Sequence, residues 1–394
     1  QSEKPRLAEI ADRVAQWFLL IVLVVAAAVG LIWWQLDASR AFWIVLALLV
    51  ATCPCALSLA TPTALTAATG SLHRLGLLLT RGHVLDGLNQ IDTVIFDKTG
   101  TLTEGRLTLS AIHPLRELDA DACLALAAAL ENRSEHPIAR AFGRAPRAAE
   151  QVDSVPGLGL DGRVEGRRLR IGQPSFVTAL AGGATPAIPG QQGQWLLLGD
   201  EQGALAWLVL DDRLRTDAPA LLAACRERGW QTLLLSGDSS PMVHEVAAQL
   251  GIADARGGLT PDAKLAVLKQ LQAQGRRVLM LGDGVNDVPV LAGADISVAM
   301  GSATDLAKTS ADAVLLSNRL DSLVQAFAMA RRTRRVIIEN LAWASLYNGL
   351  ILPFAALGWV TPLWAALGMS LSSLLVVLNA LRLTRLGAQQ PLWG

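Results

Sequence analysis

Long apolar stretches lie near both ends of the chain and enclose a polar middle. The runs at 17–36, 42–66, 337–359 and 362–381 are predominantly apolar, and each reaches the length of about 20 residues that a helix needs to cross a bilayer. Residues 70–339 separate the two pairs of runs. The pattern predicts four membrane-spanning helices that bracket a large polar domain, with the lipid bilayer as a partner.

Arginines mark one side of these predicted spans. Those flanking the spans on the side of the polar middle are Arg74, Arg81, Arg331, Arg332, Arg334, Arg335, Arg382 and Arg385. Because basic residues stay in the cytosol, we expect a multi-pass protein of the inner or plasma membrane with the middle and both termini cytosolic. The first run lacks a small-residue cleavage site, so it predicts an anchor. The alternative is a large soluble enzyme with buried core helices.

Composition and charge narrow the class of protein. Hydrophobic residues form 52% of the 394 residues, yet 17% are charged, which fits membrane helices joined to a soluble part. The formal net charge is zero, so nucleic acid is not an expected partner. Cys123 and Cys225 lie alone in Ala- and Leu-rich patterns and are predicted to be small core residues.

A reactive carboxylate is predicted at Asp97. It follows the apolar, strand-like run 93–96 and opens the segment 97–103, Asp-Lys-Thr-Gly-Thr-Leu-Thr. Open α/β sheets place reactive groups at the carboxyl ends of their strands. A carboxylate in that position can attack a phosphoryl group as a nucleophile.

Two further apolar runs, 232–235 and 278–281, lead to groups suited to phosphate and magnesium. A serine after the first run can donate a hydrogen bond to phosphoryl oxygens, and a lysine opening the next predicted helix can neutralise phosphate charge. Two carboxylates on a glycine-rich turn after the second run predict a Mg²⁺ site that includes Asp97, although Gly-Asp-Gly is also common turn chemistry. In chain order these residues are Ser236, Gly237, Asp238, Lys264, Asp283 and Asp287.

The order of these fragments resembles the haloacid dehalogenase core, a parallel sheet with helices on both faces, and the segment 97–103 resembles the signature of P-type ATPases. Phosphatases of that superfamily carry a second aspartate as general acid where this chain has Thr99. Without that acid the aspartyl phosphate should persist, as a pump requires. The resemblance implies phosphoryl transfer by Asp97, Lys98, Thr99, Ser236 and Lys264, and Mg²⁺ binding by Asp97, Thr99, Asp283 and Asp287.

An insertion at about 106–210 predicts an α+β nucleotide-binding domain within this phosphorylation domain. Its segment 131–137, Glu-Asn-Arg-Ser-Glu-His-Pro, resembles the nucleotide-domain signature of heavy-metal pumps. Taken singly, a Gly-x-Gly and a histidine are weak signals, and no Walker A sequence occurs. The resemblance assigns ATP binding to Glu131, His136, Gly157, Gly159, Gly237 and Asp238.

The second predicted span holds Cys53-Pro54-Cys55. Proline kinks a membrane helix and frees carbonyl groups, and thiolates select soft cations such as Cu(I). Alone, the motif could be a structural kink. Together with the segment 97–103 it resembles the heavy-metal-transporting branch of the P-type ATPases.

The last two predicted spans bear on the identity of the metal. Asn340, Tyr347, Asn348, Met369 and Ser373 match the copper(I) subgroup in their spacing, while the lysine and Asp-x-Gly expected of zinc pumps are missing. A thioether beside two thiolates suits Cu(I) or Ag(I). Helix packing or interhelical hydrogen bonding would explain each residue singly. The predicted metal ligands here are Cys53, Cys55, Met369, Tyr347, Asn348 and Ser373.

We therefore expect ATP-driven movement of Cu(I) out of the cytosol, with a cytosolic copper chaperone as a partner. The expected domains are 1–70 (two spans), 71–105 with 211–335 (phosphorylation), 106–210 (nucleotide binding) and 336–394 (two spans). No Thr-Gly-Glu actuator motif occurs, so phosphorylation is expected without efficient hydrolysis. The alternatives are a zinc or cadmium pump, a phosphatase and a metal-binding fragment.

Overall fold

The computed structural model describes residues 6–134, 137–189, 193–238, 242–283 and 287–388, and the chain divides into two compact units. The first unit comprises Gln1–Ile95, Asp217–Leu233 and Thr260–Gly394. The second unit comprises Phe96–Thr216 and Leu234–Leu259. The division passes through two strands, β2 (Thr93–Asp97) and β9 (Gln231–Leu235).

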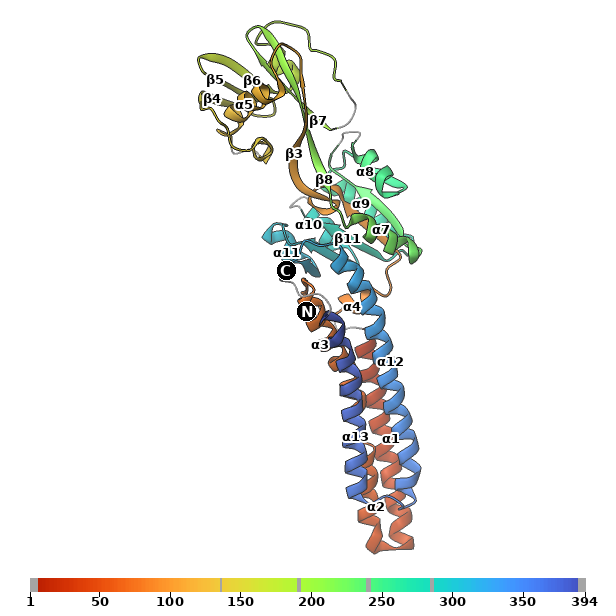
Figure 1. Ribbon diagram of the computed structural model, residues 1–394. Helices are drawn as coiled ribbons and strands as arrows, with labels where there is room; N and C mark the ends of the chain where they lie inside the picture. The colour runs from red at the N-terminus through yellow and green to blue at the C-terminus, as the bar shows by residue number, and fades with distance from the viewer. Residues whose placement is uncertain (1–5, 135–136, 190–192, 239–241, 284–286, 389–394) are drawn as a thin grey trace. The chain divides into compact units, whose positions relative to one another are not determined.

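Long helices dominate the first unit. They are α1 (Arg6–Leu36), α2 (Ala38–Ala51), α3 (Cys55–Arg74), α12 (Asp321–Ala356) and α13 (Pro362–Leu381). These helices contact one another and lie side by side in Figure 1. Small residues such as Ala26, Ala355 and Ala365 are buried where the helices meet, which allows close approach of the backbones.

The outer surface of this helix bundle is apolar. Its exposed large side chains include Trp34, Leu36, Phe42, Leu350, Trp359 and Leu363. Three stretches of the described chain are long and apolar enough to cross a membrane: Gln16–Leu36, Ala38–Arg74 and Pro362–Arg385. An apolar surface of this extent is typical of contact with lipid.

The sequence predicted four spans, and one of them is not among these three stretches. The expected span at 337–359 coincides with the C-terminal part of α12, which carries Glu339, Asn340 and Asn348 among its apolar residues. The same helix includes the arginines at 331–335. The boundary expected at residue 336 therefore lies inside one continuous helix.

The second predicted span is broken rather than merely kinked. Helix α2 ends at Ala51 and α3 begins at Cys55, because Pro54 has no backbone N–H to continue the helical hydrogen bonds. The Leu48 carbonyl oxygen near the end of α2 accepts from the Thr52 N–H at 3.0 Å and also from the Thr52 hydroxyl at 2.6 Å.

A seven-stranded sheet has the order β1-β13-β12-β11-β2-β9-β10. Its other strands are β1 (Leu77–Leu79), β10 (Asp254–Arg256), β11 (Val278–Gly282), β12 (Ile296–Met300) and β13 (Ala313–Leu315). Strand β12 is parallel to both β11 and β13, whereas β1 is antiparallel to β13. The strands β2, β11 and β12 are buried throughout, as is usual for parallel strands with covered faces.

The strands expected at 93–96, 232–235 and 278–281 are all present, as β2, β9 and β11. Shorter helices accompany the sheet: α4 (Val84–Gly87), α7 (Ala218–Glu227), α8 (Met242–Leu250), α9 (Pro261–Ala273), α10 (Val288–Gly293), α11 (Asp305–Ser310) and the 3₁₀ segment Arg382–Ala388. Thr260 and Thr304 cap α9 and α11, since each side chain accepts a hydrogen bond from a first-turn amide.

The second unit contains a six-stranded antiparallel sheet of order β3-β8-β7-β6-β5-β4. The strands are β3 (Thr103–Pro114), β4 (Ala149–Val155), β5 (Gly159–Val164), β6 (Arg167–Gly172), β7 (Gln194–Asp200) and β8 (Gly203–Leu214). Helix α5 (Ala120–Glu131), the 3₁₀ segment Pro137–Phe142 and α6 (Pro174–Thr178) contact this sheet. Strands β3 and β8 are the long paired strands labelled in Figure 1, and Thr103 pairs with Leu214.

Candidate functional site

Asp97 is the last residue of β2 and only 6% of its surface is exposed. The loop Lys98–Leu102 follows, and it turns at Gly100, where φ is +71°. The Gly100 N–H donates to the Thr103 hydroxyl oxygen at 3.2 Å, and that oxygen lies 2.5 Å from Asp212 Oδ2. These contacts fix the backbone that follows the candidate nucleophile.

Residues that we did not single out from the sequence hold this loop. Arg215 Nε donates to the Thr101 carbonyl oxygen, and Arg215 Nη2 donates to that of Gly100, both at 3.0 Å. Burial raises the pKa of Asp212 even though Thr103 bonds to its carboxylate. Thr103 belongs to the motif itself, but no sequence signal indicated that residues more than 100 positions away would support it.

Lys98 forms an ion pair with Asp238. Lys98 is 4% exposed and Asp238 is part-buried, so the pair is partly shielded from water. The Asp238 N–H donates to Ser236 Oγ at 3.1 Å. Ser236 directly follows β9 and is itself buried. The structure thus brings together Lys98, Ser236 and Asp238, three of the predicted site residues.

A cavity of about 1100 Å³ in the second unit adjoins this group. Lys98, Thr99 and Asp238 line one part of it, and Arg106 and Arg140 contribute two further cations. Such an excess of positive charge favours an anionic group such as a polyphosphate. The remaining lining residues are Gly105, Leu107, Thr108, Gly193, Gln194, Asp212 and Met242.

A second cavity, of about 300 Å³, lies in the same unit. Glu131, Gly157 and Gly159 all line it, so the structure brings together three of the predicted nucleotide contacts. Gln194 lines both cavities. The predicted contact His136 lies outside the described residues.

Gly159 cannot be replaced without cost. Its φ is +148°, and a Cβ at this position would lie 2.1 Å from the Ile171 carbonyl oxygen on the neighbouring strand. No real Cβ approaches an atom so closely, so any side chain would separate β5 from β6. Gly159 therefore allows β5 and β6 to pair where they line the smaller cavity.

Glu131 ends α5 and is 5% exposed. Burial raises its pKa from 4.5 to about 7. The carboxyl group is therefore about half protonated near neutral pH, and the protonated form can donate a hydrogen bond to a ring nitrogen.

In the first unit, Lys264 Nζ donates to Asp287 Oδ1 at 2.8 Å, and both side chains are buried. Asp287 precedes α10, and its carboxylate lies against Gly282, where an added Cβ would be 3.1 Å from Asp287 Oδ2. Asp283 directly follows β11 and is half-buried. Lys264 and Asp287 thus form a direct ion pair, which offsets part of the cost of removing both charges from water.

Cys53 and Cys55 are joined in a disulfide at the break between α2 and α3. This differs from the pair of thiolates that the sequence predicted. With only Pro54 between them, the two side chains start 5.4 Å apart at their Cα atoms, within the normal range for a disulfide. Metal binding by these sulfur atoms therefore requires the reduced form.

Several uncharged polar residues of α12 and α13 are buried, among them Asn340, Asn348 and Ser372. Asn340 accepts a hydrogen bond from Asn379 Nδ2 at 2.9 Å, and Trp343 Nε1 donates to Ser372 Oγ at 3.2 Å. Asn348 is 4% exposed. The Tyr347 hydroxyl is buried against Gly368 and has no hydrogen-bond partner among the described residues.

Helices α3, α12 and α13 meet in a common apolar cluster beside the cysteines. It contains Ala56 and Ala60 of α3, Ala344 of α12 and Val376 of α13. Met369 lies seven residues before Val376, and Ser373 lies three before it, so both occupy the side of α13 that faces the cluster. The helices bearing the predicted metal ligands therefore share one interface.

Comparisons with known proteins identify relatives along almost the whole chain. A family model described as haloacid dehalogenase-like hydrolase matches residues 91–295. The "Cation-transporting P-type ATPase B" of Mycobacterium bovis is 39% identical over 99% of this chain and 54% of its own length. The "Copper-exporting P-type ATPase" of Mycobacterium tuberculosis is 38% identical over 98% of this chain and 52% of its own length. The chain thus spans about half the length of these curated relatives.

Solved structures also match. A zinc-transporting PIB-type ATPase in the E2.Pi state superimposes with a TM-score of 0.78 at 32% identity, covering 96% of this chain and 66% of the other. The catalytic domain of the CPx-ATPase CopB-B gives a TM-score of 0.55 at 28% identity. That match covers 66% of this chain and 98% of the other.

Proposed function

The chain belongs to the haloacid dehalogenase-like hydrolases and, within them, to the P-type ATPases, and we propose that it works in an ATP-driven pump that moves Cu(I) out of the cytosol. Asp97 receives the γ-phosphoryl group of ATP. The chain sits in the cell membrane with its catalytic parts and both termini in the cytosol, and a cytosolic copper chaperone supplies the ion.

The pair of cavities that share Gln194 supports ATP as the phosphoryl donor most directly. One is lined by Glu131, Gly157 and Gly159, and the other by Lys98 and Thr99, which directly follow Asp97. The base occupies the smaller cavity, and the triphosphate extends through the larger one past Arg106 and Arg140. His136 completes the adenine contacts.

In the phosphoryl transfer, a carboxylate oxygen of Asp97 forms a bond to the γ-phosphorus while the bond from that phosphorus to the β,γ-bridging oxygen breaks, and ADP leaves. Lys98 and Lys264 offset the charge of the transferred group. Ser236 donates a hydrogen bond to a phosphoryl oxygen and keeps its proton, while its own oxygen accepts from the Asp238 amide. Gly237 and Asp238, which directly follow Ser236, complete this side of the phosphate site.

Mg²⁺ fits the donor set of Asp97, Thr99, Asp283 and Asp287, because carboxylate and carbonyl oxygens are the hard ligands that this ion prefers. The strands β2 and β11, which precede Asp97 and Asp283, are neighbours in the sheet order. Bound there, the ion neutralises charge on the transferred phosphate. Asp287 has a supporting role in this site, because its Oδ1 already accepts from Lys264.

The transported ion is held within the helix bundle. We assign it to the reduced sulfur atoms of Cys53 and Cys55 and to Met369, with Tyr347, Asn348 and Ser373 completing the path. Soft sulfur donors favour Cu(I), and the name of the mycobacterial copper-exporting relative supports this choice. A zinc or cadmium pump is the second candidate, favoured by the zinc-transporting structural match.

The test is incorporation of γ-labelled phosphate from ATP into the purified chain, with Asp97→Asn as the control. We expect labelling that requires Mg²⁺, is lost in Asp97→Asn, is sensitive to hydroxylamine and responds to Cu(I). A response to Zn²⁺ alone would favour the second candidate. Hydrolysis of free phosphoesters without ATP would indicate a phosphatase, and copper binding without labelling would indicate a metal-binding fragment.

A further inference from the structure

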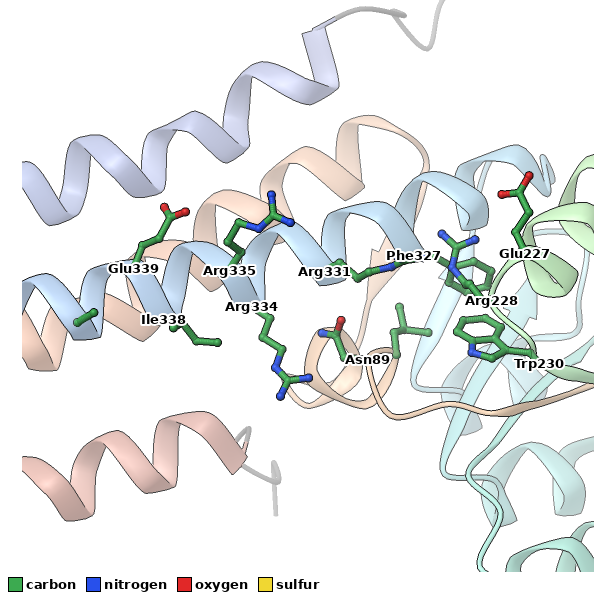
Figure 2. Close-up of a pocket in the computed structure, with 12 residues that line it drawn as sticks. Asn89, Glu227, Arg228, Trp230, Phe327, Arg331, Arg334, Arg335, Ile338 and Glu339 are labelled. Carbon is green, nitrogen blue, oxygen red and sulfur yellow. The ribbon is translucent and has the colours of Figure 1, made fainter.

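A cavity of about 830 Å³ in the first unit plays no part in this reaction. It lies along α12, beside the end of α7 and the residues after α4 (Figure 2). Asn89 ties that last segment to α12, because its side-chain amide donates to the Ala330 carbonyl oxygen at 3.0 Å. The cavity is lined by Leu88, Asn89, Glu227, Arg228, Trp230, Phe327, Arg331, Arg334, Arg335, Ile338, Glu339 and Ala342.

Four arginines dominate its charge: Arg228, Arg331, Arg334 and Arg335. Two carboxylates oppose them, but Glu339 already accepts from Asn379 at 3.1 Å and lies 3.7 Å from Arg382. Within the described part of the chain, no ion pair engages any of the four arginines. The cavity therefore has an uncompensated positive charge that favours an anion.

Arg228 is only partly satisfied by the protein, since its Nη1 donates to the Ala224 carbonyl oxygen at 2.7 Å. Its Nε is buried and has no hydrogen-bond partner among the described residues, and its guanidinium lies 5.3 Å from the Phe327 ring and 5.6 Å from the Trp230 ring. The two rings pack edge to face at 4.8 Å. Burial, and then the nearby charge of Arg331, lower the pKa of Arg228. A cation in this setting gains most from an anionic partner.

Part of the cavity lining is apolar. Leu88, Ile338 and Ala342 contribute to it, and half of the Ile338 side chain is exposed. Ile338 lies where the arginine-rich part of α12 gives way to its apolar part, at the start of the stretch expected to enter the bilayer. One cavity thus offers arginines at the membrane surface and an apolar wall beside the hydrocarbon region.

We propose that this cavity binds the phosphate-bearing headgroup of an anionic phospholipid. The guanidinium groups of Arg228, Arg331 and Arg334 hold the phosphate through charge-assisted hydrogen bonds, and an acyl chain lies along Ile338 and Ala342. A free phosphate ion would use the arginines but leave the apolar wall uncovered. Basic residues that served only to orient the helix would not need a guanidinium such as that of Arg228, which packs near two aromatic rings with its Nε buried.

Native mass spectrometry of the detergent-purified full chain tests the proposal, with phosphatidylglycerol, phosphatidylcholine and inorganic phosphate as separate probes. We expect phosphatidylglycerol to bind and phosphatidylcholine to be lost. Each arginine is worth about fivefold, so Arg331→Gln with Arg334→Gln should weaken binding about 25-fold. Arg332→Gln removes one positive charge from α12 outside the cavity, the counterpart of Arg334→Gln alone, and should change binding less than twofold.

Equal losses in Arg332→Gln and the double variant would overturn the proposal, because general surface charge would then explain the binding. Inorganic phosphate that binds as tightly as phosphatidylglycerol would also overturn it, by identifying a free anion as the ligand. Thermal melting checks that each variant is folded. If the double variant fails to fold, Arg334→Gln alone, at an exposed position, should still give about a fivefold loss. These measurements do not depend on transport or on phosphorylation.

Discussion

Glu131 makes the stability of the second unit depend on pH. Its pKa is about 7 in the folded state and 4.5 ordinarily, because burial disfavours the charged form. The folded state therefore binds more protons than the unfolded state between these values. The free energy of unfolding should fall by up to about 3 kcal/mol as pH rises from 4.5 to 7, and then level off.

Replacing Glu131 with Gln should remove this slope. Melting followed by the fluorescence of Trp195 and Trp207, in the same unit, gives the free energy of unfolding at each pH. Glu150→Gln, at an exposed carboxylate, is the matched control and should keep the slope. An unchanged slope in Glu131→Gln would show that another group titrates.

Gly282 sets the position of Asp287. A Cβ on Gly282 would lie 3.1 Å from Asp287 Oδ2 and 3.2 Å from its Cβ, so Gly282→Ala must displace the carboxylate that Lys264 holds. We expect a loss of about 1–3 kcal/mol in the free energy of unfolding and weaker dependence of Asp97 phosphorylation on Mg²⁺.

Gly183→Ala is the control for this substitution, because an added Cβ at Gly183 meets no atom within 4 Å. Denaturant unfolding and a Mg²⁺ titration of labelling measure both effects. If Gly282→Ala behaves like Gly183→Ala, the contact between Gly282 and Asp287 has no influence on the site.

At the scale of elements, the break between α2 and α3 places two sulfur atoms next to each other. The disulfide between Cys53 and Cys55 has no thiolate to offer a metal. We therefore expect the chain to bind Cu(I) only after reduction, and Cys53→Ser with Cys55→Ser to abolish that binding.

A competition titration with a Cu(I)-specific chromophoric chelator, before and after reduction, measures the difference. Cys123→Ser with Cys225→Ser is the control, since both of these cysteines are free and buried. Equal copper binding by the oxidised and reduced protein would place the metal elsewhere.

Three strands of the seven-stranded sheet, β2, β9 and β11, could be predicted from the sequence, and the family and structural matches confirm the predicted haloacid dehalogenase-like fold. These strands were predictable because each is a short apolar run directly before, or close before, a polar residue of the site: Asp97, Ser236 or Asp283. The supports of the site could not be predicted in the same way, because Asp212 and Arg215 reach Thr103 and Gly100 through a pairing of β3 with β8 that no local pattern encodes.

The membrane part was predicted less completely. The apolar runs correctly indicated long helices, but α12 mixes arginines, polar residues and apolar residues in one helix and therefore does not resemble a simple span. The spacing of Met369 and Asn348 predicted copper. The comparisons confirm a cation-transporting family and leave the metal itself as a proposal.

At the scale of the whole molecule, residues 103–214 should fold when expressed alone. Thr103 and Leu214 are paired at the ends of β3 and β8, so the two cut ends lie side by side. The segment has its own buried core, which includes Leu130, Leu169, Leu198 and Leu208. We expect a monomer that unfolds cooperatively in denaturant.

Leu169→Ala in this excised segment should cost about 2–5 kcal/mol, because Leu169 is fully buried. Leu158→Ala, at a side chain that is 38% exposed, is the control and should cost much less. A non-cooperative transition in the unsubstituted segment would mean that its core depends on the rest of the chain.

Helix α12 has a mechanical consequence. It runs without interruption from Asp321 to Ala356, about 54 Å at the usual rise per residue, and the Asp217 carboxylate accepts from the Leu320 amide at 2.7 Å just before its first residue. A continuous helix of this kind resists bending. We expect a rotation at its Asp217 end to reach the turns that carry Tyr347 and Asn348, so this one helix could link the proposed phosphorylation to the proposed ion site.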